Sequence, residues 1–157
     1  MDPRLTLRPI VLDDLPFLYE VYAGTRAEEM AAVPWSEEQK QAFLRMQFDL
    51  QRRFYEENFP DAEYSIVLLD GRPAGRLYVH RRPDEIRLID IALLPEHRGA
   101  GHGTALLRRL FGEATAAGKP LRIHVERFNP ALRLYQRLGF TQIADQGVYL
   151  LMEWVPR

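Results

Sequence analysis

The segment from Arg98 to Thr104 (RGAGHGT) constrains the fold of this 157-residue chain more than any other part of the sequence. It follows a run from Ile86 to Leu94 that is apolar nearly throughout, as is typical of a strand buried on both faces. After it, leucines at helical spacing predict a helix to about Ala117, with Gly118 beyond its end. Glycines at alternate positions lack the Cβ atoms that would keep a ligand away from the main chain. The N–H groups at the start of a helix attract an anion. With the fixed charge of Arg98, the pattern predicts a phosphate or pyrophosphate site.

Two phosphate-binding classes with different folds, the P-loop proteins and the dinucleotide-binding proteins, use a glycine-rich turn of this kind. A P-loop needs Lys and then Ser or Thr after the last glycine, whereas Gly103 is followed by Thr104 and Ala105, which excludes it. A dinucleotide-binding fold places the turn after its first strand, and only Glu126 loosely fits its acidic position. A glycine-rich turn that binds nothing is the third alternative.

The rest of the chain predicts a mixed α/β fold in one domain, residues 1–157. Asp13 or Asp14 is expected to cap the first helix, Ser36 with Gln39 forms a capping box, and Asp70-Gly71 predicts a hairpin. Pro130 is expected at the first position of the last helix. We expect a mostly antiparallel sheet of about six or seven strands flanked by four helices. The expected strands are 5–8, 64–69, 74–80, 86–94, 121–126, 140–144 and 148–154, and the expected helices are 13–25, 36–59, 104–117 and 130–138.

The composition excludes several classes of function. There is no cysteine, which removes disulfides, thiol nucleophiles and thiolate metal sites. Four scattered histidines without an HxH or HxxxH pair predict no metal site. The net charge of −1 argues against nucleic acid as a partner, and no apolar run is long enough to span a membrane. The N-terminus does not resemble a signal peptide, so we expect a cytoplasmic protein.

Two motifs resemble those of the GNAT superfamily of N-acetyltransferases. The run from Ile91 to Leu107 (IALLPEHRGAGHGTALL) is similar to its acyl-CoA-binding motif, with the core Arg/Gln-x-x-Gly-x-Gly/Ala. The run from Asn129 to Phe140 (NPALRLYQRLGF) resembles its second motif. Both occur in the family's order, and the resemblance extends over roughly residues 4–155. It implies a GNAT-like fold and acetyl-CoA as the cofactor.

The resemblance also implies which residues bind coenzyme A. Main-chain groups of Ile91, Ala92 and Leu93 are expected to bond the pantetheine arm, in a gap where the strands of Ile91 and His124 separate. The pyrophosphate is expected at the turn, with His102 pointing outward and offering only its amide. The full expected set is Ile91, Ala92, Leu93, Arg98, Gly99, Ala100, Gly101, His102, Gly103, Thr104, Asn129 and Tyr135.

Two residues are catalytic candidates. Tyr135 matches the family's general acid, because a phenol can protonate a departing thiolate; the alternative is a core tyrosine. His124 is the candidate base for the acceptor amine, and the alternative is a structural strand histidine. Glu126 and Asp90 are expected nearby and could relay protons through water.

The acceptor site is the least defined part. In this fold, the segment from about Ala23 to Glu38 lines it, so Glu28, Glu29 and Trp35 are candidates for holding a cationic amine, with Tyr149 on the opposite wall. A solvated helix end anchored by Trp35 is the alternative.

We therefore expect an acetyl-CoA-dependent N-acetyltransferase that acts on a primary amine by direct transfer in a ternary complex. Without a cysteine, a thiol-borne acyl-enzyme is excluded. The acceptor is expected to be a small-molecule or peptide amine, and a homodimer is one expectation from the family. The alternative function is a non-catalytic acyl-CoA-binding or sensing module.

Overall fold

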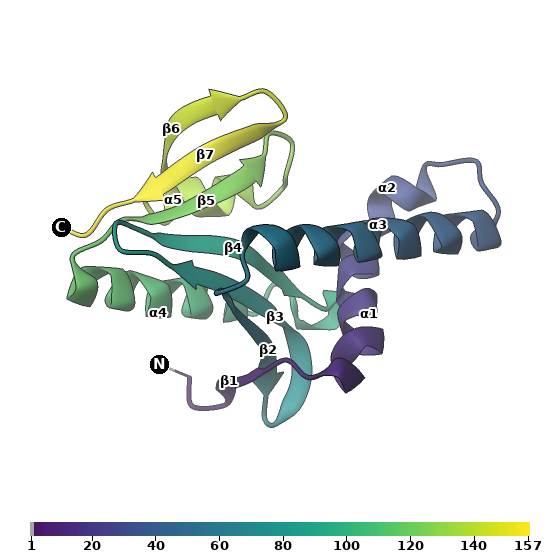
Figure 1. The fold of residues 1–157 in the computed structure, drawn as a ribbon, viewed down its shortest axis with the longest axis horizontal. Coiled ribbons are helices and arrows are strands. Elements are labelled where there is room, and N and C mark those ends of the chain that lie inside the picture. The colour runs from purple at the N-terminus through teal and green to yellow at the C-terminus, as the bar shows by residue number, and fades with distance from the viewer. Residues whose placement is uncertain (1) are drawn as a thin grey trace.

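A seven-stranded sheet forms the centre of the molecule, whose computed structural model describes residues 2–157 (Figure 1). Its strand order is β1-β2-β3-β4-β5-β7-β6. Only β4 and β5 run parallel; the other neighbours in the described sheet are antiparallel. The strands are β1 (Leu5–Pro9), β2 (Glu63–Leu69), β3 (Arg72–Arg81), β4 (Ile86–Leu93), β5 (Leu121–Glu126), β6 (Thr141–Gln146) and β7 (Tyr149–Trp154).

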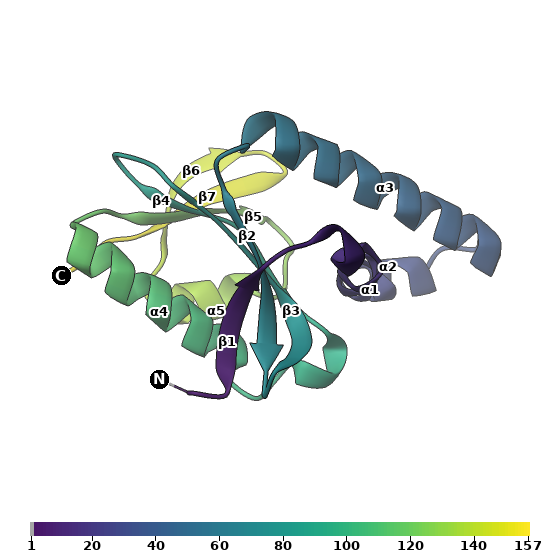
Figure 2. The same cartoon turned by 60° about the horizontal axis from the view of Figure 1, so that its bottom comes forward.

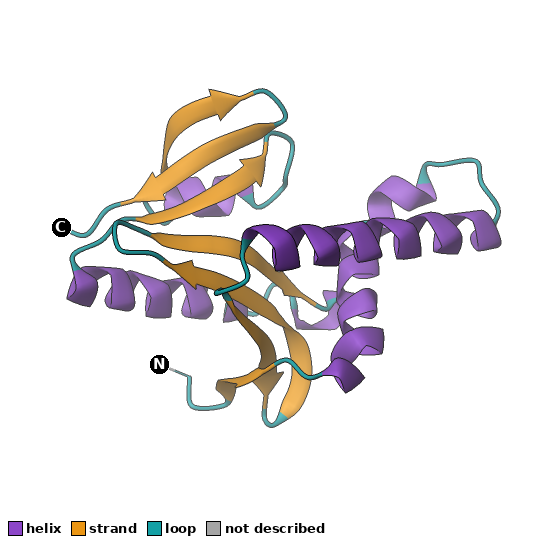
Figure 3. Cartoon of the chain, viewed as in Figure 1, coloured by secondary structure: helices purple, strands orange, loops and turns teal. Residues whose placement is uncertain are grey.

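Helices cover both faces of this sheet, as Figures 2 and 3 show. One core cluster packs α1 and α3 against Ile66, and a larger one packs α4 and α5 against the opposite face, where the neighbouring Val67 points. This alternation is the two-residue period of a strand. The α-helices are α1 (Leu15–Thr25), α2 (Ala27–Ala31), α3 (Glu37–Asn58), α4 (His102–Ala117) and α5 (Leu132–Arg137), and the 3-10 turns are η1 (Leu12–Asp14) and η2 (Pro95–His97).

The predicted mixed α/β fold is confirmed, with seven strands in the predicted order. Ser36 and Gln39 form the predicted capping box of α3, and both Asp70 and Gly71 have the positive φ angles, 52° and 77°, that the tight hairpin requires. Five α-helices are present rather than four, because the chain between α1 and α3 forms the short α2.

Three helix starts differ from the expectation. Helix α4 begins at His102, so Gly103 and Thr104 lie in its first turn. Helix α5 begins at Leu132, which leaves Pro130 in the preceding turn rather than at the first helical position. Neither aspartate caps α1 with its side chain.

The carboxylate of Asp14 has stronger donors than the N–H groups of α1. The guanidinium of Arg8 on β1 holds both of its oxygens at 2.8 Å, and the Val11 N–H donates to it at 2.8 Å. These charge-assisted bonds lower the pKa of Asp14, the Arg8 bond being the largest cause. Asp14 therefore ties β1 to the start of α1.

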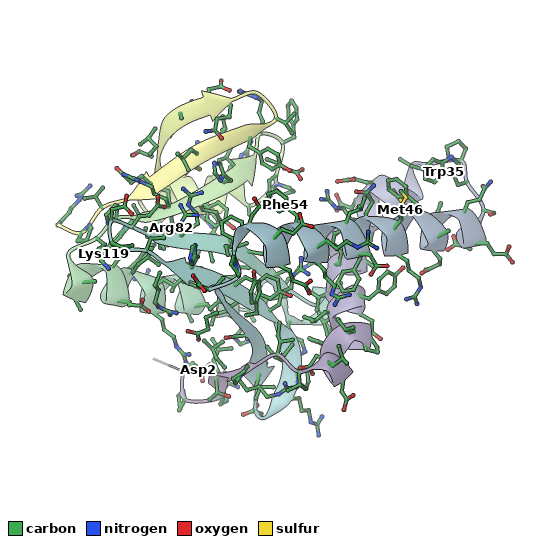
Figure 4. The ribbon with its side chains drawn as sticks, viewed as in Figure 1. Asp2, Trp35, Met46, Phe54, Arg82 and Lys119 are labelled. Atoms are coloured by element: carbon green, nitrogen blue, oxygen red, sulfur yellow. The ribbon has the colours of Figure 1, made fainter. Side chains whose placement is uncertain are left out.

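Helix α3 carries two apolar faces, and only one is covered. Leu44 and Phe48 are buried against α1 and the sheet, whereas Met46, Leu50 and Phe54 are about half exposed. Figure 4 shows Met46 and Phe54 on the outer side of the helix. Helical spacing locates the helix but cannot decide which stripe packs.

Among residues 2–157, no helix is long and apolar enough to cross a membrane. In the same range, no three His, Asp or Glu side chains gather as a metal site would require.

Gly75 allows the closest approach between β3 and β4. A Cβ atom there would lie 2.2 Å from the carbonyl oxygen of Ala92 and 3.0 Å from the Cα of Leu93. Gly75→Ala should therefore lower the free energy of unfolding by about 2 kcal/mol or more, because main-chain atoms must move. Chemical denaturation measures this change. Gly112→Ala in α4, where a Cβ would meet nothing within 4 Å, should instead be neutral or stabilising by up to about 1 kcal/mol. Equal effects of the two substitutions would contradict the argument.

Candidate functional site

Strands β4 and β5 pair over only three residues and then separate. The pairs are Ile86 with Leu121, Arg87 with Arg122, and Leu88 with Ile123. Beyond Leu88, the β5-facing edge of β4 has no strand partner among the described strands, and a bulge follows at the register shift opposite Tyr78 and Val79. Figure 1 shows the two strands diverging from this point. A linear ligand can therefore bond the free main-chain edge of β4.

The structure places Ile91, Ala92 and Leu93 on this unpaired edge. Ala92 is buried, and Ile91 and Leu93 are half-buried. Their strand leads directly through η2 into the glycine turn.

The glycine turn leaves a row of main-chain donors at the start of α4. Gly99 and Gly101 have φ angles of 76° and 86°, in the left-handed region that glycine adopts without strain. The first helical bond runs from Ala105 N–H to Gly101 O, and none of the N–H groups from Gly99 to Thr104 has an acceptor among residues 2–157. Since the 16-residue α4 also directs its positive dipole end here, the turn fits a diphosphate.

Arg98 fixes the turn to the end of β4. Its Nε donates to the carbonyl oxygen of Leu93 at 3.1 Å. One of its Nη atoms lies 3.6 Å from where a Cβ of Gly24 on α1 would be. Arg98 itself is exposed, so it offers a positive charge to a ligand at the turn, and the neighbouring Ala100 is also exposed.

His102 does not point outward, so that expectation is wrong. The residue is 9% exposed and begins the stripe that continues with Leu106 and Leu110 four and eight positions on. Helical spacing carries the buried face of α4 back to its first residue. Gly103 and Thr104 beside it are half-buried.

Tyr135 is both a core residue and a protonated phenol. It is 5% exposed on α5, and its ring meets that of Phe140 edge-on at 5.6 Å. Burial, and then the charge of Asp90, raise the pKa of Tyr135 well above its usual value. The phenol therefore keeps its proton at neutral pH, as a proton donor must.

His124 is the first residue of β5 beyond the last pair with β4. Its side chain faces solvent, and its Nδ1 lies 3.0 Å from the guanidinium of Arg87. Partial burial, followed by the charge of Arg87, lowers the pKa of His124. Its imidazole is therefore neutral near pH 7 and can accept a proton.

Two carboxylates lie on the same side of the sheet as His124. Glu126 follows it by one strand period and meets Arg26, which lies between α1 and α2, at 3.5 Å. Asp90 on β4 meets Arg76 of β3 at 2.5 Å.

Sequence reasoning missed Arg76 and Tyr55, which surround Asp90. Arg76 is 2% exposed and also donates to Gln51 of α3 at 3.1 Å. Tyr55 of α3 has its pKa raised by burial and then by the charge of Asp90. The only signal for Arg76 is a charged residue inside an otherwise apolar strand, and its partners come from distant elements.

Asn129 uses its side chain to shape the turn before α5. Its Oδ1 accepts from Ala131 N–H at 2.8 Å, and its own N–H donates to Glu126 O at 2.9 Å. The side-chain carbonyl oxygen of Asn129 is thus used within the turn, which leaves the side-chain NH₂ group to bind a ligand.

The expected acceptor residues are not brought together. Trp35 packs edge-on against Phe43 with ring centres 5.3 Å apart, at the outer end of α3, away from the strand gap (Figure 4). Glu28 and Glu29 are exposed on α2. Tyr149, however, opens β7 directly opposite Glu126, on the same side of the gap as His124.

Replacing Arg87 should change the titration of His124. Because a nearby positive charge disfavours the imidazolium, Arg87→Gln should raise the pKa of His124 relative to the unsubstituted protein. NMR titration of the ring protons measures this pKa. Arg108→Gln, an exposed substitution on α4, is the control and should leave it unchanged. A fall in the pKa of His124 in the Arg87 variant would contradict the assignment.

Comparison with known proteins gives one family and one fold. A model described as the Acetyltransferase (GNAT) family matches residues 21–140. A protein of Bacillus subtilis (strain 168), provisionally named ribosomal protein bS18-alanine N-acetyltransferase, is 26% identical over 167 residues, which cover 99% of this chain and 97% of that protein.

Two crystal structures are similar over nearly the whole chain. PaiA N-acetyltransferase from Thermoplasma acidophilum, in complex with coenzyme A, has a TM-score of 0.71 and 21% identity, with 99% of each chain covered. The ribosomal-protein-S18-alanine N-acetyltransferase from Escherichia coli has a TM-score of 0.65 and 23% identity, covering 98% of this chain and 95% of that one. At these identities the likeness establishes the fold.

Proposed function

We propose, since the chain belongs to the GNAT family of acetyltransferases, that it acetylates a primary amine at the end of a peptide. Membership makes it an acyltransferase, with acetyl-CoA as its cofactor. The observation that carries the proposal is the separation of β4 from β5 directly beside a turn with free N–H groups. The free edge of β4 and the free N–H groups of the turn lie on one continuous segment, which runs from β4 through the glycine turn into α4.

The described residues fit coenzyme A at two places. Main-chain N–H groups from Gly99 to Thr104, with the charge of Arg98, would hold the diphosphate. The free edge of β4 at Ile91, Ala92 and Leu93 would bond the pantetheine arm. When bound, acetyl-CoA supplies a thioester as the acetyl donor. A main-chain N–H of β4 in the gap is suited to stabilise negative charge on the carbonyl oxygen.

Tyr135 and His124 are the proposed catalytic residues. The raised pKa of Tyr135 keeps a proton on the phenol, which it can give to the leaving thiolate. The lowered pKa of His124 keeps the imidazole free to take a proton from the acceptor amine. Asp90 and Glu126, on the same face, can pass protons through water. Direct transfer is further supported by the lack of cysteine in the chain.

The names of relatives support a peptide acceptor. The Bacillus subtilis relative and a Haemophilus influenzae relative, 36% identical over 61 residues, are named for the alanine of ribosomal protein bS18. We therefore propose that the acceptor of this protein is the N-terminal amine of a peptide. We also propose that the enzyme acts in the cytoplasm and has neither nucleic acid nor a membrane as a partner. A single domain and a homodimer remain predictions, which limited proteolysis and size-exclusion chromatography can check.

The test is a panel of amines incubated with acetyl-CoA and the full chain, with release of free thiol as the measurement. Peptides with N-terminal alanine should react fastest, ahead of the same peptides with a blocked N-terminus and an internal lysine, and ahead of polyamines. Binding of coenzyme A without thiol release from any amine would favour the non-catalytic module. Preference for a small amine would overturn the peptide acceptor.

Tyr135→Phe should lower kcat by about a hundredfold or more, because the proton donor is removed while the ring remains. Affinity for coenzyme A should change less than about twofold. Tyr19→Phe, which removes another buried phenol hydroxyl, is the matched control and should keep normal turnover. Unchanged kcat in the Tyr135 variant would remove Tyr135 from the mechanism.

Gly103→Glu should weaken coenzyme A binding about tenfold or more, because a carboxylate then faces the diphosphate. The fold should tolerate it, since a Cβ at Gly103 meets nothing within 4 Å and acidic residues suit a first helical turn. Gly112→Glu, on the same helix and equally open, is the control. Isothermal titration calorimetry compares the two variants, and equal affinities would place the diphosphate elsewhere.

A further inference from the structure

A cavity of about 360 Å³ lies on the α1 and α3 side of the sheet, apart from the β4–β5 gap. Its walls come from the β1–α1 segment, α3, β2 and β3, and it includes no residue of β4, β5 or the glycine turn. Figures 1 and 2 show α1 and α3 on the same side of the sheet, opposite α4. The volume is within the range of small-molecule sites, and exceeds that of apolar cavities known to hold benzene.

One wall of this cavity is entirely apolar. Val11 and Leu12 on it are 54% and 77% exposed, so they lie at the mouth of the cavity. The wall consists of Pro9, Ile10, Val11, Leu12, Leu15 and Leu18. It is suited to the hydrocarbon part of a ligand.

The facing wall is aromatic. Tyr64 and Tyr78 meet edge-on with ring centres 4.8 Å apart, and Tyr55 meets Tyr78 at 5.7 Å. The hydroxyl of Tyr64 donates to the main-chain oxygens of Phe59 and Tyr55, so its polar end is satisfied by the protein. A flat ring or short chain would therefore lie between an aliphatic and an aromatic surface.

The polar end of the cavity contains a buried guanidinium with a spare donor. Arg76 is 2% exposed and lines the cavity. Its Nη2 contacts Gln51 and Asp90, but its Nε has no acceptor among residues 2–157. A buried donor without an acceptor is destabilising, so an added acceptor at this end would be stabilising.

A second guanidinium, that of Arg52, also lines the cavity and is loosely paired. Its nearest carboxylate atoms, on Asp49 and Glu56, lie at 3.7 Å and 3.8 Å. Both acids have side chains more than half exposed, so they can turn to solvent when a stronger anion arrives. Arg52 therefore has donors to offer.

We propose that this cavity binds a small carboxylic acid with an aromatic or short aliphatic body, independently of coenzyme A. The body lies between the aliphatic and tyrosine walls, and the carboxylate takes the donors of Arg52 and Arg76, whose planar forks match its two oxygens. Because Arg76 also contacts Asp90, the ligand would compete with that ion pair.

The test uses the full chain and 3-phenylpropionate as the probe, followed by ¹H–¹⁵N NMR. Shifts should concentrate in residues 9–18, 51–56, 64 and 76–78, and should persist when coenzyme A is saturating. The neutral amide of the same acid is the matched ligand and should bind about fivefold more weakly or worse. Shifts centred on residues 91–104, displacement by coenzyme A, or equal binding of acid and amide would each overturn the proposal.

Two adjacent arginines on α3, the half-buried Arg52 and the exposed Arg53, provide matched variants. Arg52→Gln should reduce the preference for the acid over the amide to less than about twofold, whereas Arg53→Gln, which does not line the cavity, should retain it. Val11→Asp, which places a carboxylate at the exposed mouth, should also weaken the acid selectively. Equal loss in the Arg52 and Arg53 variants would mean that general surface charge, rather than the cavity, attracts the probe.

Discussion

Main-chain pairing between β4 and β5 holds for three residue pairs and ends at Leu88 and Ile123, and the site proposed for acetyl transfer lies beyond this end. Up to this point the two strands complete a continuous sheet, with α4 and α5 packed beneath it. Beyond it, β4 continues with one bonded edge, to β3, and one free edge. Polar main-chain groups inside a protein need partners, so a free edge next to a donor-rich turn is costly unless a ligand or water completes it.

The surrounding packing keeps this gap in place. Gly75 allows β3 to approach the Ala92 carbonyl, and the Leu93 carbonyl is held by Arg98. Tyr135 of α5 belongs to the core cluster on the α4 side of the sheet, and its burial keeps the phenol protonated. The buried guanidinium of Arg76 pairs with the half-buried carboxylate of Asp90, which compensates the charge of Arg76 inside the protein.

Local sequence patterns predicted those parts of the fold that depend on neighbouring residues. Turn chemistry at Asp70 and Gly71, the cap at Ser36 and the glycine turn each follow from a few adjacent residues, and the structure contains all three. The GNAT resemblance supplied the family, but the residue roles that it implies remain predictions. What the patterns could not provide was the choice between two apolar stripes on α3, since both have helical spacing. The role of Arg76 could not be predicted either, because its partners Gln51 and Asp90 are 25 and 14 positions away in the sequence.

The bare α-carbon of Gly24 has a mechanical consequence. A Cβ there would lie 3.3 Å from the ring of Pro95, so α1 rests directly on the connection between β4 and α4. Arg26, which directly follows α1, meets Glu126 of β5 at 3.5 Å. Helix α1 therefore contacts the β4–α4 connection directly and β5 through the adjoining Arg26. A change in the separation of β4 and β5 would require α1 to move as well.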